Sequence, residues 1–131
     1  MRRSDRGNYV TYKGPKVDTT TKTRREIELP LWAQEAKVAA LEGLLDALGF
    51  VPVAEVRKQR RKAAIPWQGR QVEASLDEVV EVGTYVELEL VVEDDDVDSA
   101  RACIASLAEH LGLSGSERRS YLELLLEKRG P

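Results

Sequence analysis

The chain has 131 residues, of which 42% are hydrophobic and 33% are charged, so it is long enough for one domain with a core and short for two. Its 20 basic and 23 acidic side chains nearly cancel, which argues against nucleic acid or an anionic membrane as the main partner. No apolar run is long enough for a signal peptide or a membrane span, and the single cysteine has no partner for an internal disulfide. We therefore expect one cytoplasmic domain covering residues 1–131.

The first strand signal covers residues 9–13 and stops at Gly14-Pro15, because proline cannot donate to a strand ladder and glycine permits a turn. A loop or hairpin tip is expected at residues 18–21. Residues 22–29 then alternate again, and we expect this second strand to pair with the first. Every second residue of it is charged: Lys22, Arg24, Glu26 and Glu28.

The middle of the chain predicts one helix and three strands. Apolar residues recur at helical spacing over residues 32–48 and Gly49 supplies a stop, which predicts a helix that covers a sheet. The three predicted strands cover residues 51–62, 71–77 and 85–92, with turns at Gly69 and Gly83.

Charged and apolar residues alternate in these strands, most regularly from Val86 to Glu89. Such alternation gives a strand one charged face and one apolar face. A charged face is usually in plain contact with water, and the basic run 57–62 is equally typical of a guarded sheet edge or a weak nucleic-acid patch. The pattern alone predicts a mostly antiparallel α+β domain with a charged sheet face.

The last third of the chain predicts two helices. Acidic residues 93–98 precede a helix that reaches about Leu111, where carboxylates favour the positive end of the helix dipole. Calcium binding is the weaker alternative, because the glycine and terminal glutamate of a calcium loop are missing. Within this helix Cys103 has the spacing of a buried residue. His110 has no other ligand candidate beside it and is expected on the surface. The final helix covers residues 118–128.

Two kinds of candidate site residue share this charged face. A triphosphate carries several charges, so its site needs several Lys and Arg groups from different strands. The candidates are Lys13, Lys22, Arg24, Lys58 and Arg60. Mg²⁺ and Mn²⁺ bind one or two carboxylates together with substrate phosphates, and Glu87, Glu89 and Asp77 are the candidates for that role.

Six motifs in consistent order resemble the CYTH family, which groups class IV adenylate cyclases with thiamine triphosphatases. They are TYKGPK (11–16), KTRREIE (22–28), Lys58-x-Arg60, LDEV (76–79), GTYVELE (83–89) and RSYLELL (119–125). The YKGP and SYLELL portions look most like the class IV cyclase branch. The resemblance implies an antiparallel β-barrel of the triphosphate tunnel type, with charged side chains in its lumen and helices outside.

The resemblance also implies roles for individual residues. Lys58 and Arg60 would be catalytic and would bind the substrate together with Arg2, Lys13 and Arg24. Glu87 and Glu89, with Asp77 nearby, would hold the Mg²⁺ or Mn²⁺ ion. Family members begin with a Glu-x-Glu-x-Lys strand, a helix and further strands that are missing here, and Met1-Arg2 looks like the end of the family's Arg-x-Arg strand. We therefore expect an N-terminally incomplete domain with Met1 as an internal methionine, and a second copy, in a homodimer, is one way to supply strands.

The function implied is that of a metal-dependent enzyme like a class IV adenylate cyclase, which converts ATP to cyclic AMP and pyrophosphate. One alternative is a triphosphatase that hydrolyses the terminal phosphate of thiamine triphosphate or inorganic triphosphate. Another is a non-catalytic binding module for polyphosphate or nucleotide, which the missing Glu-x-Glu-x-Lys strand favours.

Overall fold

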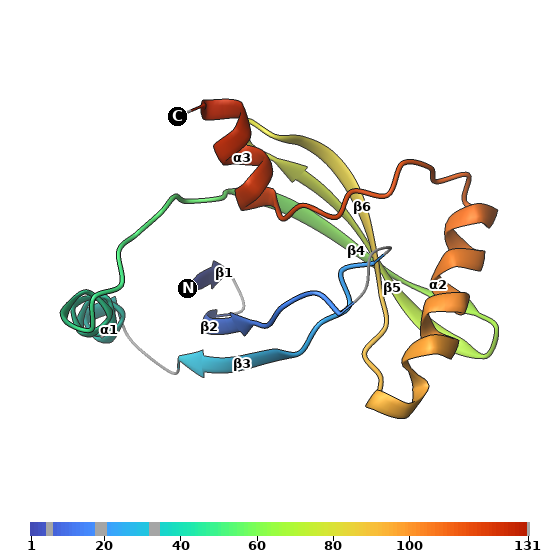
Figure 1. Cartoon of the computed structure of the whole chain (residues 1–131), viewed down its shortest axis with the longest axis horizontal. Coiled ribbons are helices and arrows are strands. Elements are labelled where there is room, and N and C mark those ends of the chain that lie inside the picture. Colours follow the sequence, from blue (N-terminus) through green and yellow to red (C-terminus); the bar gives the residue numbers. More distant parts are fainter. Residues whose placement is uncertain (5–6, 18–20, 32–34, 131) are drawn as a thin grey trace. The chain divides into compact units, whose positions relative to one another are not determined.

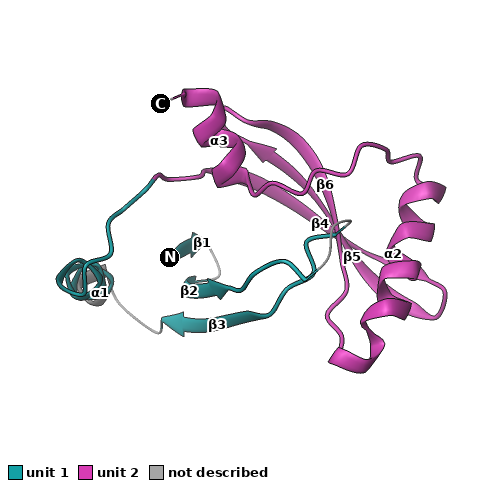
Figure 2. Ribbon diagram, in the orientation of Figure 1, with its two compact units in different colours: residues 1–53 teal, residues 54–131 magenta. Residues whose placement is uncertain are grey.

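The computed structural model describes residues 1–4, 7–17, 21–31 and 35–130. They form two compact units, Met1–Val53 and Ala54–Pro131 (Figure 2). Each unit contains one antiparallel sheet of three strands, which confirms the predicted α+β class, and no closed barrel is formed by the described residues. The assignment of residues 1–131 to a single domain stays a prediction. Outside the described residues lie parts of two predicted elements, residues 18–20 of the hairpin tip and residues 32–34 of the first helix.

The first sheet has the strand order β1-β2-β3 (Figure 1). Its strands are β1 (Arg2–Ser4), β2 (Gly7–Lys13) and β3 (Glu26–Leu31). The antiparallel register of β2 and β3 confirms the predicted pairing of residues 9–13 with residues 22–29. Regular pairing begins only at Glu26, because β2 ends at Lys13. Beyond the predicted end, β3 continues through Pro30, since a strand at the edge of a sheet loses no ladder bond there.

The helix predicted over residues 32–48 is present as α1 (Glu35–Ala47). Its apolar side chains are buried only in part. Val38 is buried, whereas Leu44 and Leu48 are exposed. Burial of these apolar side chains is therefore limited to Val38 among those described, and that the helix covers a sheet stays a prediction.

The second sheet is an antiparallel meander of β4, β5 and β6 (Figure 1). These strands are β4 (Lys58–Trp67), β5 (Arg70–Val79) and β6 (Gly83–Glu89). Gln68 and Gly69 join β4 to β5 with φ angles of 47° and 75°. Positive φ at both central residues is what a two-residue type I′ hairpin turn requires, so the predicted turn at Gly69 is confirmed.

The strand predicted over residues 51–62 lies later in the chain, because β4 begins at Lys58. Residues 51–57 have no regular structure although they are rich in valine. The ten-residue ladder with β5 instead carries β4 through Ala63, Ala64 and Pro66. Pairing with a neighbouring strand thus outweighs local strand propensity here.

Helix α2 (Val97–His110) packs on one face of the second sheet and follows the short 3₁₀ helix η1 (Asp94–Asp96). Val72 of β5 forms a buried cluster with Cys103 and Leu107 of α2. Only 2% of Cys103 is exposed, which confirms its predicted packing role. His110 is on the surface as predicted, with its ring centroid 4.6 Å from that of Trp67.

Helix α3 (Tyr121–Arg129) packs on the opposite face of the same sheet. Val79 and Val72 are an odd number of positions apart along β5, so their side chains point to opposite faces. Val79 forms a second buried cluster with Val82, Leu124 and Leu125. The two clusters place α2 and α3 on different faces, and α3 covers one end of the face that also carries Asp77.

The acidic segment 93–98 lies at the start of α2, as predicted. Asp96 occupies the N-cap position but makes no side-chain cap hydrogen bond. It accepts two hydrogen bonds from Arg70 instead, at 2.5 and 2.7 Å. This ion pair joins the first residue of β5 to the beginning of α2. No helix in the part of the chain described here is both long and apolar enough to cross a membrane.

Candidate functional site

The pleat of the second sheet brings charged residues from all three strands to one face. Arg60 of β4 lies directly opposite Asp77 of β5, and Ser75 of β5 lies opposite Glu87 of β6. Lys58 is two positions from Arg60 and therefore shares its face. The sheet therefore brings Lys58 and Arg60 to one face, although both come from β4 and not from different strands. We call Lys58, Arg60, Asp77 and Glu87 the charged cluster.

Asp77 is the centre of the charged cluster and has no solvent exposure. Its Oδ2 accepts hydrogen bonds from Lys58 Nζ at 2.9 Å and from Arg60 Nη2 at 2.5 Å. Its Oδ1 accepts from Arg60 Nε at 2.6 Å. Burial raises the pKa of this carboxyl, but hydrogen bonds from Arg60, Lys58 and Tyr121 outweigh that effect and hold the pKa well below its usual range. Asp77 is therefore ionised, and both of its oxygens are engaged by donors.

Arg60 bridges two carboxylates. Besides Asp77, its Nη2 contacts Glu87 Oε2 at 2.5 Å. The hydrogen bonds with Asp77 raise the pKa of the guanidinium, burial opposes this, and Glu87 adds to it. The planar group of an arginine can serve two acceptors in fixed directions, which a lysine ammonium cannot do in the same way.

Lys58 is held between a carboxylate and an aromatic ring. Its Nζ lies 5.1 Å from the centroid of the Tyr121 ring, within the range of a cation–π contact. Burial lowers the pKa of the ammonium, while the hydrogen bond to Asp77 acts in the opposite direction. Burial and the neighbouring charge of Arg60 prevail, so the pKa of Lys58 lies below its usual value.

The charged cluster contains two cations and two carboxylates, so its formal charge is zero. A polyanion is attracted to unpaired cations, and here each cation is already paired. Glu87 is the more exchangeable partner, because 37% of its side chain is exposed and Asp77 is fully buried. An incoming phosphate can thus replace Glu87 at Arg60 while Asp77 keeps its place.

The predicted metal ligands Glu87 and Glu89 lie on the same face of β6, two positions apart. No group of three or more His, Cys, Asp and Glu side chains gathers into a metal site among the described residues. Two carboxylates alone fit an ion that also takes phosphate oxygens, which is how Mg²⁺ is commonly held, and do not form a cage for an ion bound by protein alone. Asp77, predicted to lie near the metal, is engaged by Lys58 and Arg60 in this arrangement.

The other predicted substrate-binding residues belong to the first unit, where each cation also has a carboxylate partner. Arg2 Nη1 lies 3.3 Å from Glu28 Oε2, and Lys13 Nζ lies 2.8 Å from Glu26 Oε1. Arg24 precedes β3 and lies 3.0 Å from Glu26. Burial raises the pKa of Glu26, but hydrogen bonds and charge from Lys13 and then Arg24 bring it below its usual value. The first sheet therefore repeats the charge pairing of the second.

Tyr121 is part of the site but was not among the predicted site residues. Its hydroxyl donates to Asp77 Oδ2 at 2.8 Å. Burial raises the pKa of this hydroxyl, as does its hydrogen bond to Asp77, so it remains a donor. The motif RSYLELL contained the residue, but no spacing rule joins positions that are 44 apart in the sequence.

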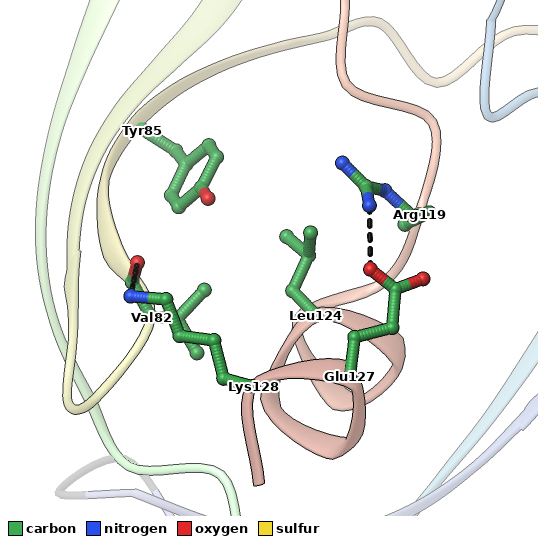
Figure 3. A pocket seen from close by; sticks show the side chains of 6 residues that line it. All are labelled: Val82, Tyr85, Arg119, Leu124, Glu127 and Lys128. Carbon is green, nitrogen blue, oxygen red and sulfur yellow. Dashed lines mark hydrogen bonds and ion pairs between the residues drawn. The ribbon is translucent and has the colours of Figure 1, made fainter. Parts of the chain in front are cut away.

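A surface cavity of about 350 Å³ lies beside the charged cluster, between β6 and α3 (Figure 3). Its lining residues are Val82, Tyr85, Arg119, Leu124, Glu127 and Lys128. The cations at its rim are engaged, since Lys128 Nζ donates to the Val82 carbonyl at 3.1 Å and Arg119 pairs with Glu127 at 2.5 Å. The ring of Tyr85 contacts that of Tyr121 at 5.3 Å between centroids, which joins the cavity to the charged cluster.

These features define an antiparallel α+β protein in which basic residues are paired with carboxylates of neighbouring strands on one sheet face. Residues 1–121 match the CYTH domain, and the chain belongs to the CYTH family. This confirms the resemblance drawn from the six sequence motifs.

Individual relatives agree with this membership. The chain is 35% identical, over 126 residues, to a Methanocaldococcus jannaschii protein named "Putative adenylate cyclase MJ0240", and the match covers 93% of this chain and 67% of that protein. The solved structure of the PH1819 protein from Pyrococcus horikoshii is similar at 42% identity with a TM-score of 0.78, over 92% of this chain and 66% of that one. A conserved hypothetical protein from Pyrococcus furiosus is similar at 26% identity with a TM-score of 0.71, over 88% and 66%. The chain thus spans about two thirds of the length of these relatives.

Proposed function

We propose that this protein is a metal-dependent triphosphate-binding enzyme of the class IV adenylate cyclase type, which converts ATP to cyclic AMP and pyrophosphate. CYTH membership and the name of the M. jannaschii relative support the proposal. The observation that carries it is the convergence of Lys58 and Arg60 on one sheet face, within reach of Glu87.

Lys58 and Arg60 are proposed to bind phosphate oxygens. Arg60 would exchange Glu87 for a phosphate while keeping its two hydrogen bonds to Asp77, so its guanidinium stays oriented during binding. Arg2, Lys13 and Arg24 are proposed to bind further phosphate oxygens in the same way, each by exchanging a carboxylate. The family's tunnel-type barrel, with charged side chains in its lumen, belongs to this proposal.

Glu87 and Glu89 are the proposed ligands of a Mg²⁺ or Mn²⁺ ion shared with the phosphates. Such an ion neutralises phosphate charge and polarises the reacting phosphoryl group. When a phosphate oxygen replaces Glu87 at Arg60, the Glu87 carboxylate becomes available to the metal ion. Phosphate binding and metal binding are therefore expected to strengthen each other.

In the proposed reaction the ribose 3′ oxygen forms a bond to the α-phosphorus as the bond from that phosphorus to the bridging oxygen breaks. The 3′ hydroxyl gives its proton to water, and pyrophosphate leaves with the electron pair of the broken bond. The contribution of Lys58 and Arg60 is to position the phosphates and to stabilise the charge that develops on the leaving group.

Product analysis tests the proposal. The protein is incubated with ATP, with thiamine triphosphate and with inorganic triphosphate, each with and without Mn²⁺. Cyclic AMP with an equal amount of pyrophosphate supports a cyclase, whereas orthophosphate from a triphosphate supports the triphosphatase. Binding without any turnover identifies a non-catalytic module and contradicts the proposed enzyme.

A further inference from the structure

The start of α3 is fixed by a capping box and by buried leucine side chains. Ser120 caps the helix by accepting from the Glu123 backbone N–H at 3.2 Å, and Glu123 in turn accepts from the Ser120 N–H at 2.5 Å. This reciprocal capping box satisfies two backbone donors at the first turn. Leu124 and Leu125 anchor the next turn in the buried cluster with Val79. The first residue of the helix, Tyr121, therefore has a well-defined position.

From that position Tyr121 makes two different contacts with the charged cluster. Its hydroxyl is the only donor to Asp77 among the described residues that carries no charge. Its ring lies against the ammonium of Lys58. Asp77 Oδ2 is shared by Tyr121, Lys58 and Arg60, so the direction of the hydroxyl influences where both cations can sit.

We propose that Tyr121 is a positioning residue, which holds the Asp77 carboxylate and through it sets Lys58 and Arg60 in the orientation that receives phosphate. The inference rests on the proposed triphosphate site. This gives the RSYLELL motif a structural role. The capping box and the leucines hold α3 in place, and Tyr121 at its start therefore orients Lys58 and Arg60 on the sheet through Asp77. Groups held in advance bind a ligand without the cost of ordering them.

Tyr121→Phe isolates the hydroxyl, since it keeps the ring against Lys58. Tyr85→Phe is the matched control, because Tyr85 lies on the same face, contacts the Tyr121 ring and does not donate to Asp77. Both variants, and the wild-type chain, are titrated with tripolyphosphate in the presence of Mn²⁺ by calorimetry. The side-chain Nε–H signal of Arg60 is followed by NMR in the ligand-free proteins.

Loss of one hydrogen bond to a charged group is expected to weaken tripolyphosphate binding by about tenfold in Tyr121→Phe. The Arg60 Nε–H signal should shift and exchange faster with water in that variant. Tyr85→Phe should match the wild type in both respects. If Tyr121 had only a structural role, Tyr121→Phe would lower thermal stability, but the two variants would not differ in tripolyphosphate affinity or in the Arg60 signal.

Three results bear on the inference differently. Separation of Tyr121→Phe from Tyr85→Phe in both readouts supports it. If both variants bind tripolyphosphate as tightly as the wild type and the Arg60 signal is unchanged, this role for Tyr121 is wrong. The proposed triphosphate site is not affected by that result. A folded wild-type chain that binds no tripolyphosphate overturns the proposed function, and the positioning role falls with it.

Discussion

Asp77 shows why a buried carboxylate is stable on this sheet. A charge in a site without solvent exposure is unfavourable unless hydrogen bonds and opposite charges compensate for it. Two cations and a hydroxyl do so here. The same contacts that make the carboxylate tolerable orient the two basic side chains, so stability and site geometry depend on one residue.

Replacement of Asp77 by Asn tests this dependence through pH. The pKa of Asp77 is lower in the folded chain than in the unfolded one, so its stabilising contribution is complete above about pH 4 and is lost as pH falls through the folded value. At pH 7 we expect Asp77→Asn to lower the free energy of unfolding by about 2 kcal/mol, since Lys58 and Arg60 lose the charge of Asp77, while Arg60 keeps Glu87 and both side chains retain some contact with water. Urea denaturation at pH 7, 4 and 3 measures this difference.

The difference between the wild type and Asp77→Asn should shrink as pH falls below about 4. Glu78→Gln is the matched control, because Glu78 is the next residue on β5 and is exposed on the opposite face, beside Arg61. Its effect should stay within about 0.5 kcal/mol at all three pH values. A destabilisation by Asp77→Asn that is the same at pH 7 and pH 3 would contradict the account of Asp77 as a stabilising anion.

At the scale of elements, the β4–β5 hairpin depends on one left-handed turn. Gly69 has a φ of 75°, and a Cβ atom there would meet no atom within 4 Å. Gly69→Ala should therefore destabilise the chain by about 1 kcal/mol through backbone conformation alone.

Gly43 lies inside α1 and also has open space around it, so Gly43→Ala should stabilise that helix by a similar amount. Both variants add the same methyl group, and thermal unfolding measures the effect of each on stability. If both substitutions shifted the unfolding temperature in the same direction, backbone conformation would not decide the effect.

Alternation predicted the strands best where one face meets a helix and the other carries charge. Residues 83–89 and 70–79 fit this description, and their strands were predicted with small errors at the ends. The strand at residues 51–62 was predicted too early, because Val51 and Val53 favour extended structure locally whereas the hairpin turn at Gly69 decides which residues pair. Local propensity cannot reveal such a choice.

The same limit applies to the site. Lys58, Arg60 and Asp77 were predicted as neighbours of a phosphate and metal site by family resemblance, and the sheet register brings them into contact. That Asp77 engages both cations, instead of lying free beside a metal, follows from side-chain geometry that a sequence does not contain. Tyr121 reaches the cluster through the packing of α3, which is a long-range contact.

At the scale of the whole molecule, the apolar cores lie in the second unit. Both buried clusters belong to it, whereas Val38 is the one buried apolar side chain among the described residues of the first unit. We expect the fragment of residues 54–131 to fold on its own and to unfold cooperatively in urea, with a near-ultraviolet signal from Trp67 and its tyrosines. The fragment of residues 1–53 should lack a cooperative transition. An unfolded 54–131 fragment would show that its core requires the first unit.

We propose above all that the charged face of the second sheet binds triphosphate through Lys58 and Arg60. Calorimetric titration with tripolyphosphate, with and without Mn²⁺, tests it most directly when the wild type is compared with Arg60→Ala and Arg61→Ala. Arg61 is the matched control, because it follows Arg60 on β4, points to the opposite face and has 76% of its side chain exposed beside Glu78. We predict binding that Mn²⁺ strengthens in the wild type and in Arg61→Ala, and a loss of about a hundredfold or more in Arg60→Ala. Equal affinity of the two variants, or no binding by a folded wild-type chain, would contradict the claim.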